Sequence, residues 1–482
     1  MHRLRPPATI AAGALALWVA LPAYVNYDTA WSLVWGGELA RGAKPNLEAL
    51  SAPTPHPLGT LLGVLLAPLE AAAADVATLL VLGSLAAVVW LALALGRGWF
   101  GGAAGWVAAA LALTSVPLLT TAARAYLDVP YLALVLGALL VETRRPRAGA
   151  PVLALLAVAG LWRPEAWLFS AAYWVWSARG RPRGEAARLA VLAAAAPLAW
   201  LLGDLVLAGD PLHSFTWTRE QAATLGRARG PGAIRAALPD KLAHAAGLPV
   251  LIAGTAGLAL LLRRRPRAGG GLAAAALGAS LATAAGLTAA GMPVVERYLL
   301  LPLVLLIVLA AGAAVEAYMS LRLRVAPASK SDSPGYLQPG RAATPRRPVA
   351  IGVVLGAAVL VVLASSVPAR LSEVAARRGD LAAQATLRAD LRALADRGAL
   401  HRRCAVVASN HKLIPLLALW TGRAPASFGA GGPVEAYVEP ATAAAQRTLL
   451  LASSDPPEAA PGPPAGAVEV ARNGAWRVEA RC

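Results

Sequence analysis

The sequence predicts an α-helical polytopic membrane protein with a small α/β domain at its C-terminal end. Of its 482 residues, 57% are hydrophobic and only 15% are charged. A soluble protein could not shield so much apolar surface from water. The formal net charge is +18, but the basic residues fall in short clusters between apolar runs, such as Arg144–Arg147 and Arg263–Arg267. This pattern is typical of cytoplasmic loops and not of a nucleic-acid surface.

Apolar runs predict the membrane spans in chain order. Nine runs are near the roughly 20 residues that a bilayer requires: 8–25, 73–96, 102–121, 126–143, 187–208, 247–263, 270–291, 298–320 and 348–367. We interpret the first as an uncleaved signal anchor and not as a cleaved signal peptide. The stretch 150–178 is too long for one span and has basic clusters at both ends. We therefore expect a hairpin of two short helices there, with Arg163-Pro164-Glu165 at its tip. About eleven transmembrane helices result, with the N-terminus in the cytoplasm and the C-terminus outside.

The first outer loop, 26–72, is expected to carry interfacial helices. Residues 31–39 have helical spacing and an aromatic edge, and 58–70 are apolar but short and flanked by proline. Both stretches suit helices that lie in, or re-enter, the outer interface. The loop 322–347 is rich in Ser, Pro, Gly and Arg, which predicts a disordered cytoplasmic linker.

A change of composition divides the chain into a transmembrane module, 1–368, and an extracytoplasmic domain, 369–482. Residues 371–397 alternate charged residues with Ala and Leu at helical spacing. Strand-like runs at 404–409 and 448–452 flank an expected helix at 413–420, which predicts a small α/β fold. The only cysteines, Cys404 and Cys482, both lie in this domain. In an oxidising compartment they could form a disulfide, or they could remain two unpaired thiols.

Charged residues at the outer ends of the spans are the candidate functional residues. Asp28 directly follows the first span, and a carboxylate near hydrocarbon is costly enough that it tends to be kept for chemistry or for a partner. Asp128 follows Arg124 by four residues, so on a helix the two share one face and could form either a salt bridge or part of a catalytic site. His56 stands in a stiff Pro-rich segment at the membrane surface.

Two further groups complete the set of candidates. Arg163 and Glu165 can pair at the hairpin tip, and Arg297-Tyr298 begins a late span. An arginine at a span's outer end can be a snorkelling anchor, or it can bind a phosphate through two hydrogen bonds. Two aspartates could share a divalent cation, although no cluster of ligands makes this compelling. A Gly-rich phosphate loop after a strand, which a soluble nucleotide-sugar would require, is not present in the sequence.

The order and placement of these residues resemble the GT-C glycosyltransferases. The most similar branch contains the protein O-mannosyltransferases and the aminoarabinose transferase for lipid A, and the resemblance covers roughly residues 1–320. Asp28 matches the family's catalytic acidic position in the first outer loop, and Asp128 matches the second acidic position. The Arg-Tyr-Leu-Leu-Leu-Pro run at 297–302 and the outer C-terminal domain also fit. The family often ends the first outer loop with Lys-Pro, whereas this chain has His56-Pro57.

The resemblance implies an inverting transfer of a hexosyl or pentosyl group from a polyprenyl-phosphate donor. The acceptor would be a lipid, a glycan or a protein on the outer face of the cytoplasmic membrane, as in cell wall biogenesis. Asp28 would act as general base, with Asp128 as its acidic companion. The residues expected to bind substrate, or to stabilise charge on the departing phosphate, are His56, Arg124, Arg163, Glu165, Arg297 and Tyr298.

Two other function classes make different predictions. A transporter or a flippase for lipid-linked sugars would show inverted repeats and polar residues deep within its spans, whereas here the polar residues lie at the outer ends. A non-catalytic scaffold, with an outer tail that binds a partner or a cell-wall glycan, would retain its function after Asp28→Asn. The sequence favours the transferase.

Overall fold

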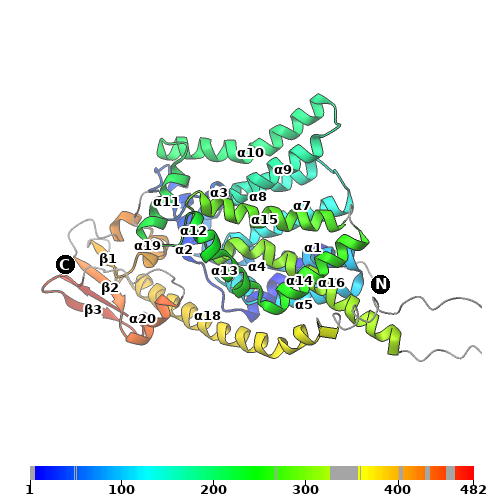
Figure 1. The fold of residues 1–482 in the computed structure, drawn as a ribbon. Coiled ribbons are helices and arrows are strands. Elements are labelled where there is room, and N and C mark those ends of the chain that lie inside the picture. Colours follow the sequence, from blue (N-terminus) through cyan, green and yellow to red (C-terminus); the bar gives the residue numbers. More distant parts are fainter. Residues whose placement is uncertain are drawn as a thin grey trace, which may run out of the picture.

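The computed structural model describes residues 6–481 apart from 48, 50, 51, 266–268, 326–356, 359, 401–404, 429–434 and 452–461. The first part of the chain is a helical bundle, and the last part is a long helix followed by a small sheet (Figure 1). The bundle consists of α1 Pro6–Ala20, α2 Tyr27–Ala40, α3 Pro57–Leu66, η1 Ala67–Ala72, α4 Ala73–Phe100, α5 Gly102–Leu113, α6 Val116–Ala123, α7 Asp128–Arg144, α8 Ala150–Trp162, α9 Glu165–Ala178, α10 Arg183–Ala208, α11 His213–Thr224, α12 Pro231–Ala236, α13 Leu238–Ala246, α14 Leu248–Arg264, α15 Gly271–Ala289, η3 Glu296–Leu299 and α16 Leu300–Val325.

Apolar helices long enough to cross a membrane confirm a multi-pass membrane protein. Among the described residues four such stretches occur, at Pro57–Phe100, Arg183–Ala208, Gly271–Ala289 and Glu296–Leu321. Two bent pairs of helices raise the number to six if each pair is one span: α5 with α6, bent by 56°, and α12–α13 with α14, bent by 92°. The expected number of about eleven also counts shorter apolar helices, and it stays a prediction. Most of the expected span 348–367 and of the linker 322–347 lies outside the described residues.

The stretch 150–178 forms two helices, as predicted. α8 ends at Trp162 and α9 begins at Glu165, so that Arg163 and Pro164 make the connection. Proline disfavours the helical conformation of the residue before it, and Arg163 is extended, with φ −151° and ψ 130°. The two helices lie side by side with α10 (Figure 1). The break therefore places Arg163 and Glu165 at one end of the bundle.

Two helices, α2 and α3, form in the expected first outer loop, and they cross at a pair of glycines. Their place in the membrane interface stays a prediction, since α3 also begins the apolar stretch Pro57–Phe100. A Cβ atom added to Gly36 would lie 2.2 Å from the carbonyl carbon of Gly63, and one added to Gly63 would lie 2.3 Å from the Ser32 oxygen. Such a close approach of two backbones is possible only without side chains at the crossing. α3 continues through η1 into α4 with a break at Glu70, where φ is 45°.

The C-terminal domain is a mixed sheet with helices against it. Its elements are α18 Val367–Asp396, β1 Val406–Ala408, η4 His411–Leu413, α19 Ile414–Thr421, η5 Pro425–Phe428, β2 Ala436–Pro440, α20 Ala443–Leu450, β3 Val468–Arg472 and β4 Trp476–Ala480. The strand order is β1-β2-β4-β3; β1 and β2 are parallel, and the other pairs are antiparallel. The predicted first strand and the predicted helix at 413–420 are confirmed by β1 and α19.

The second predicted strand, 448–452, is wrong. Residues 448–450 form the end of α20, whose first turn is capped because the Thr442 hydroxyl accepts a hydrogen bond from the Ala445 amide at 3.1 Å. Alanine-rich segments favour helix, and Ala445 and Leu449 bury one helical face. The sheet is instead completed by β2, β3 and β4.

The first outer loop and the C-terminal domain share one hydrophobic core. Trp31 and Trp35 of α2 are fully buried in the same cluster as Leu391 of α18, Leu417 of α19 and Trp476 of β4. A second and larger core lies inside the bundle, where α16 is almost wholly buried against α4, α5 and α14. The first core lies at the end of the bundle where α2 begins, whereas the larger one runs along the bundle, from Val129 to Leu140 of α7.

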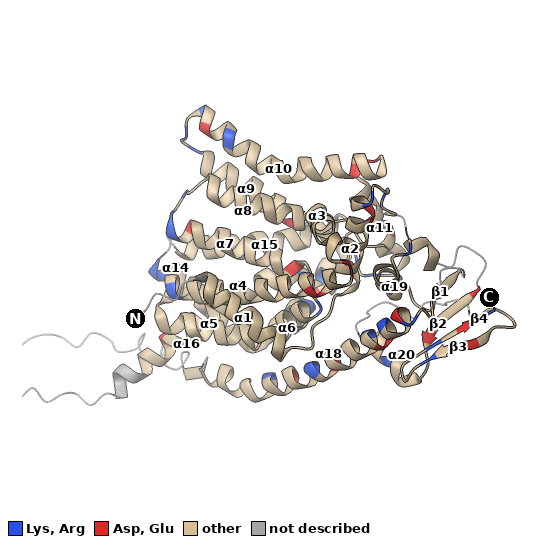
Figure 2. Cartoon of the chain, turned by 180° about the vertical axis from the view of Figure 1, so that it is seen from behind, with Lys and Arg blue, Asp and Glu red and all other residues tan. Residues whose placement is uncertain are grey.

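The basic clusters lie at the opposite end of the bundle from the sheet. Figure 2 shows blue residues at the end of α7, the start of α10 and the end of α14, all far from β1–β4. These are the clusters around Arg144, Arg183 and Arg264. Because Lys and Arg are enriched in cytoplasmic loops, this end has the character of the inner face.

Candidate active site

Local backbone structure fixes Asp28 at the start of α2. Asn26 caps this helix, since its side-chain oxygen accepts a hydrogen bond from the Thr29 amide at 2.8 Å. The Thr29 hydroxyl in turn donates to the Ala125 carbonyl oxygen at 2.7 Å. Ala125 has a φ of 48°, an unusual value for a residue other than glycine. The turn before α7 and the start of α2 are thereby held together, although about a hundred residues separate them.

Asp28 forms an ion pair with Arg297. Its Oδ2 atom accepts a hydrogen bond from Arg297 Nη1 at 2.6 Å, whereas Oδ1 accepts none from any described residue. Burial raises the pKa of Asp28, but the nearby positive charges, led by Arg297, outweigh this effect, and the pKa lies below its ordinary value. Asp28 is therefore ionised at neutral pH and keeps one oxygen available to accept a proton.

Asp128 pairs with Arg163, and not with Arg124. The Asp128 Oδ1 atom accepts from Arg163 Nη1 at 2.6 Å, and the same oxygen lies 3.9 Å from Arg297 Nε. Arg163 also donates to Glu165, with Nη2 2.7 Å from Oε1, as the sequence suggested for this pair. Asp128, Arg163 and Glu165 are all buried. A continuous network of five charges therefore runs from Asp28 through Arg297, Asp128 and Arg163 to Glu165.

The three carboxylates of this network all lie in the first turn of a helix. Asp28 is the second residue of α2, Asp128 begins α7 and Glu165 begins α9. The amide groups of a helix N-terminus carry partial positive charge, which stabilises a carboxylate placed there. Three carboxylates face two guanidinium groups, so the network carries one negative charge in excess. Additional cations nearby are needed to balance it.

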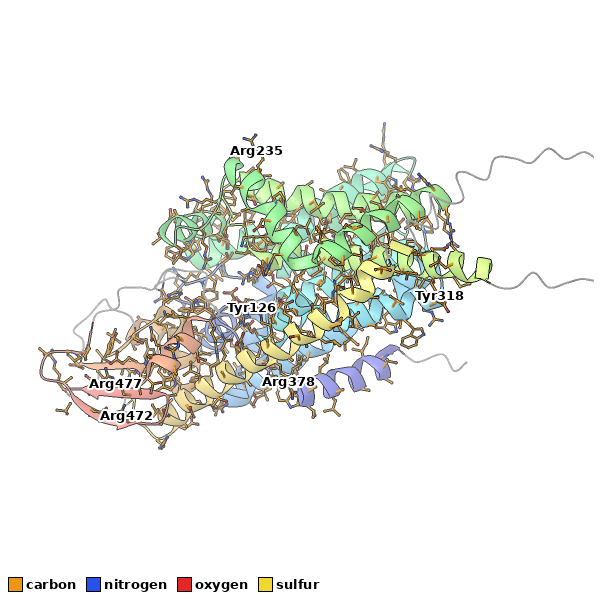
Figure 3. All side chains as sticks on the ribbon, turned by 60° about the horizontal axis from the view of Figure 1, so that its bottom comes forward. Tyr126, Arg235, Tyr318, Arg378, Arg472 and Arg477 are labelled. Atoms are coloured by element: carbon orange, nitrogen blue, oxygen red, sulfur yellow. The ribbon has the colours of Figure 1, made fainter. Side chains whose placement is uncertain are left out.

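Aromatic rings support the two arginines. The Arg297 guanidinium lies 5.0 Å from the centre of the Tyr126 ring, and that of Arg163 lies 4.6 Å from the Tyr298 ring. A cation over an aromatic face is stabilised by the ring quadrupole. Tyr298 therefore contributes by supporting Arg163. Figure 3 labels Tyr126 in the interior, between the bundle and the C-terminal domain.

His56 precedes α3 and is packed against aromatic side chains. Its ring meets Trp200 edge to face at 5.6 Å, and Trp200 meets Trp167 in the same way. The Nδ1 atom is buried without a hydrogen-bond partner among the described residues. Burial and the charge of Arg163 lower the pKa of His56 to about 4. A neutral imidazole therefore stands where the similar family often has lysine.

Arg124 joins the bundle to the C-terminal domain. It donates from Nε to the Tyr24 hydroxyl at 3.2 Å and from Nη2 to Gln384 Oε1 of α18 at 3.4 Å. Arg388 of α18 lies 4.0 Å from the centre of the Tyr24 ring. None of these contacts involves a carboxylate. Arg124 thus remains a cation whose charge is not neutralised by a described neighbour.

All these groups surround or adjoin one cavity of about 610 Å³. Asp28, His56, Arg124, Arg163, Arg297 and Tyr298 line it, whereas Asp128 and Glu165 lie behind Arg163. Hydroxyl groups of the α5–α6 break and apolar residues of α16, including Leu303 and Ile307, extend the lining into the bundle. The cavity therefore combines charged groups at one end with apolar walls at the other, which suits an amphipathic ligand.

Several lining residues were not predicted from the sequence. Cations at the rim come from four different segments: Arg227, Lys241, Arg370, Arg377 and Lys412. Arg370 and Arg377 belong to α18, whose sequence pattern predicts only a helix, and Tyr126 was counted only as the first residue of the span 126–143. A single sequence contains no signal that these segments meet. Cys404 and Cys482 lie outside the described residues.

The described residues contain no group of three or more His, Cys, Asp or Glu side chains placed to hold a metal ion. Asp28 and Asp128, the pair considered for a shared cation, instead lie on either side of Arg297.

Comparison with solved structures identifies the fold. The structure is similar over nearly its full length to a crystal structure of ArnT from Cupriavidus metallidurans bound to undecaprenyl phosphate, with a TM-score of 0.56 and 16% sequence identity; the match covers 98% of this chain and 97% of that one. The apo form of the same protein matches with a TM-score of 0.50 and 15% identity, at the same coverage. No family model and no curated protein sequence matches the chain. The expected GT-C fold is thus confirmed by structure.

Proposed function

We propose that this protein is an integral membrane glycosyltransferase that moves a sugar from a polyprenyl-phosphate donor to an acceptor outside the cytoplasmic membrane, with inversion. The observation that carries the proposal is Asp28 at the wall of the cavity, ionised and held by Arg297 with one oxygen available. The ArnT-like fold supports the donor class, because the matched ArnT crystal structure contains undecaprenyl phosphate.

The chemical step places Asp28 against the acceptor hydroxyl. Asp28 Oδ1 takes the hydroxyl proton as the acceptor oxygen attacks C1 of the sugar from the face opposite the phosphate. The bond between C1 and the phosphate oxygen breaks, its electron pair stays on that oxygen, and the donor leaves as polyprenyl phosphate. A positioned general base of this kind contributes roughly 10²–10⁴-fold. Asp128 acts indirectly, by fixing Arg163 and by attracting Arg297.

The departing phosphate requires positive charge that is not already neutralised. Arg163 is held between Asp128 and Glu165, whereas Arg124 contacts only neutral groups among the described residues. We assign the phosphate to Arg124, since guanidinium groups bind phosphate oxygens through paired hydrogen bonds. The neutral His56, placed on its aromatic support, is assigned to a hydroxyl of the sugar, because an unprotonated nitrogen accepts a hydrogen bond.

Membrane orientation follows from the charges at the two ends of the bundle. We place the basic ends of α7, α10 and α14 in the cytoplasm and the cavity with the C-terminal domain outside (Figure 2). The shorter apolar helices, such as α1 and α8, then cross together with the longer ones, as the expected eleven crossings require. A lipid donor can enter along the apolar walls of α16 while its sugar reaches Asp28.

The proposal is tested with purified full-length protein and a panel of polyprenyl-phosphate sugars. We expect one or a few donors to be consumed and the product to have the anomeric configuration opposite to that of the donor. If the protein consumes none of these donors, the proposed donor class is wrong. If the product keeps the anomeric configuration of the donor, direct attack with Asp28 as general base is wrong.

A further inference from the structure

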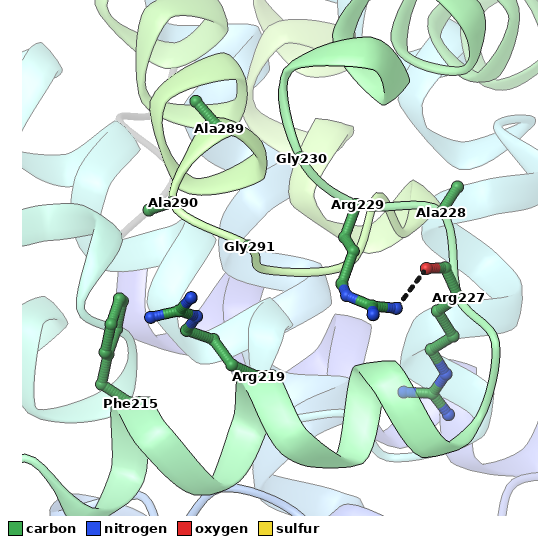
Figure 4. Close-up of a pocket in the computed structure, with 9 residues that line it drawn as sticks. All are labelled: Phe215, Arg219, Arg227, Ala228, Arg229, Gly230, Ala289, Ala290 and Gly291. Carbon is green, nitrogen blue, oxygen red and sulfur yellow. Dashed lines mark hydrogen bonds between the residues drawn. The ribbon is translucent and has the colours of Figure 1, made fainter.

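A second pocket, rich in arginine, lies on the outer loops. It has a volume of about 760 Å³ and is lined by Phe215 and Arg219 of α11, residues 227–230 before α12, and residues 289–291 at the end of α15. Figure 4 shows the side chains of Arg219 and Arg229 in the space between α11 and the two loops. We call this the arginine pocket, after Arg219, Arg227 and Arg229.

Contacts with neutral groups hold two of these arginines, Arg219 and Arg229, in place. The Arg219 guanidinium lies 5.4 Å from the centre of the Phe215 ring. Arg229 Nη1 donates to the Ala222 carbonyl oxygen at 3.2 Å. Both contacts orient a guanidinium group without neutralising its charge. The charge thus remains available to a ligand.

The two loops of the pocket are tied to each other by backbone hydrogen bonds. The Gly230 amide donates to the Thr288 carbonyl oxygen, and the Val294 amide donates to that of Ala228, both at 2.9 Å. Gly291 has a φ of 94°, and a Cβ atom on it would lie 2.9 Å from Arg219 Nε. Glycine is required here both for the backbone conformation and for the close approach of Arg219. The pocket is therefore a fixed structure in which the backbone makes room for a guanidinium group.

The charge of this pocket differs from that of the surface elsewhere. Its described lining contains three arginines and no Asp or Glu. Some exposed arginines at other places pair with carboxylates, as Arg264 does with Glu316 and Arg472 with Glu469. Among the described residues neither Arg219 nor Arg229 forms an ion pair, although both are exposed. Uncompensated guanidinium groups around a concave surface attract an anion.

Arg227 connects the arginine pocket with the cavity that contains Asp28. It lines both spaces, and its charge is among those that lower the pKa of Asp28. An acceptor that bridges the two spaces would therefore have one end at the general base and the other among arginines. The polyprenyl-phosphate donor already has Arg124 for its phosphate, so the second anion belongs to the other substrate.

We propose that the arginine pocket binds a phosphate group of the acceptor, and that the acceptor is thus an anionic molecule whose attacking hydroxyl lies apart from this phosphate. This inference rests on the proposed function, because it assigns the second substrate of the same site. Two sources have the same chemistry: the headgroup of a membrane phospholipid, and a water-soluble phosphorylated molecule.

The site itself is tested without catalysis. The purified full-length protein is treated with phenylglyoxal, which modifies accessible arginines, and the modified positions are quantified by mass spectrometry. Inorganic phosphate, added at constant ionic strength, is expected to slow the modification of Arg219 and Arg229 about tenfold. Arg235 of α12, which is exposed and projects away from the molecule in Figure 3, serves as the matched control and should be unaffected. Equal slowing at all three arginines, or at none of them, would overturn the proposal.

Two further arms identify the source of the phosphate. The protein is compared in nanodiscs of phosphatidylglycerol and of phosphatidylcholine, and separately with soluble glycerol phosphate. Protection by phosphatidylglycerol would place the group on a membrane lipid, protection by glycerol phosphate alone would place it on a soluble acceptor, and protection by neither would contradict the site. This readout does not depend on Asp28, so it can succeed or fail independently of the transferase proposal.

In the transfer assay, the double variant Arg219→Gln/Arg229→Gln should raise the KM for the acceptor at least about tenfold, since it removes charge-assisted contacts. The KM of the double variant for the donor should be unchanged. In the control variant Arg235→Gln, neither the KM for the acceptor nor the KM for the donor should change. An unchanged acceptor KM in the double variant would overturn the assignment to the acceptor.

Discussion

At the residue scale, the site depends on how charges are shared between carboxylates and arginines. Arg297 was open to interpretation as a snorkelling anchor, but its Nη1 lies 2.6 Å from Asp28 and its Nε lies 3.9 Å from Asp128. An anchor would point to the headgroup region, whereas Arg297 points to the start of two helices. The pair is half-buried. Removing one member leaves the charge of the other without its partner, so substitutions at Arg297 should affect Asp28 directly.

We expect Arg297→Gln to shift the pH dependence of transfer. The base must be ionised, so activity is lost as the pH falls through the pKa of Asp28. Arg297 lowers that pKa; without it the pKa rises, and the acid limb of kcat/KM moves to higher pH. At neutral pH we expect a loss of about 100-fold or more. A pH–rate series on both proteins measures the shift, with Arg235→Gln as the control, and an unmoved acid limb would contradict the pairing.

His56 should not titrate in the range of ordinary histidines. Because its pKa is about 4, the side chain is neutral at the pH values where the enzyme would work. His56→Gln, which keeps a neutral hydrogen-bonding group, should leave the shape of the pH profile unchanged and raise the donor KM only a few-fold, on the order of one hydrogen bond. If the wild type shows a limb near pH 6.5 that disappears in His56→Gln, the neutral assignment is incorrect.

At the element scale, helix starts and helix crossings assemble the site. Three helices begin at its three carboxylates, and the crossing of α2 with α3 holds Asp28 near His56. Sequence patterns located these helices because their apolar runs and prolines are local signals. The crossing at Gly36 and Gly63 was not predicted, since nothing in either segment alone indicates which glycines meet.

Gly36→Ala tests the helix crossing. The new Cβ would lie 2.2 Å from the Gly63 carbonyl carbon, and such overpacking typically costs about 1–3 kcal/mol. We expect a lower midpoint of thermal unfolding and a loss of transfer, because the displacement reaches Asp28 at the start of α2. Gly203→Ala in α10, where a Cβ meets nothing within 4 Å, is the matched control and should unfold at or slightly above the wild-type temperature. Equal behaviour of the two variants would show that the crossing tolerates side chains.

At the scale of the whole molecule, the outer end of the bundle and the C-terminal domain form one unit around the cavity. α2 shares a core with the sheet, and Arg370 and Arg377 of α18 reach the cavity rim. The basic clusters lie at the far end of the bundle (Figure 2). This polarity places all of the proposed chemistry on one side of the membrane.

Fusions to an alkaline phosphatase reporter, which is active only outside the cytoplasm, test this orientation. A fusion after Val367 should be active, and one after Arg145, in the basic loop at the end of α7, should be inactive. The positive-inside rule supplies the expectation. An active fusion after Arg145 together with an inactive fusion after Val367 would reverse the orientation, and Asp28 would then lie on the cytoplasmic side.

The sequence was informative where signals are local. Hydropathy, proline and charge placement predicted the membrane class, the break at Arg163-Pro164 and the ends of spans that carry Asp28, Asp128 and Arg297. Contacts between distant segments could not be predicted, and these decide the site. Asp128 pairs with Arg163, which lies 35 residues away. It does not pair with Arg124, because α6 ends at Ala123 and α7 begins at Asp128, so the two residues do not share a helix face. The strand expected at 448–452 failed for a similar reason, because the Thr442 cap and the sheet partners outweigh a short apolar run.

The central claim, that Asp28 is the general base, is tested most directly by the rate of sugar transfer in Asp28→Asn. Asparagine preserves the size of the side chain but cannot accept the proton, so we expect kcat to fall roughly 10²–10⁴-fold while thermal stability changes little. Asp240→Asn is the matched control, because Asp240 is exposed in the first turn of α13, and it should transfer at the wild-type rate. Transfer by Asp28→Asn at the rate of the wild type and of the control would contradict the account.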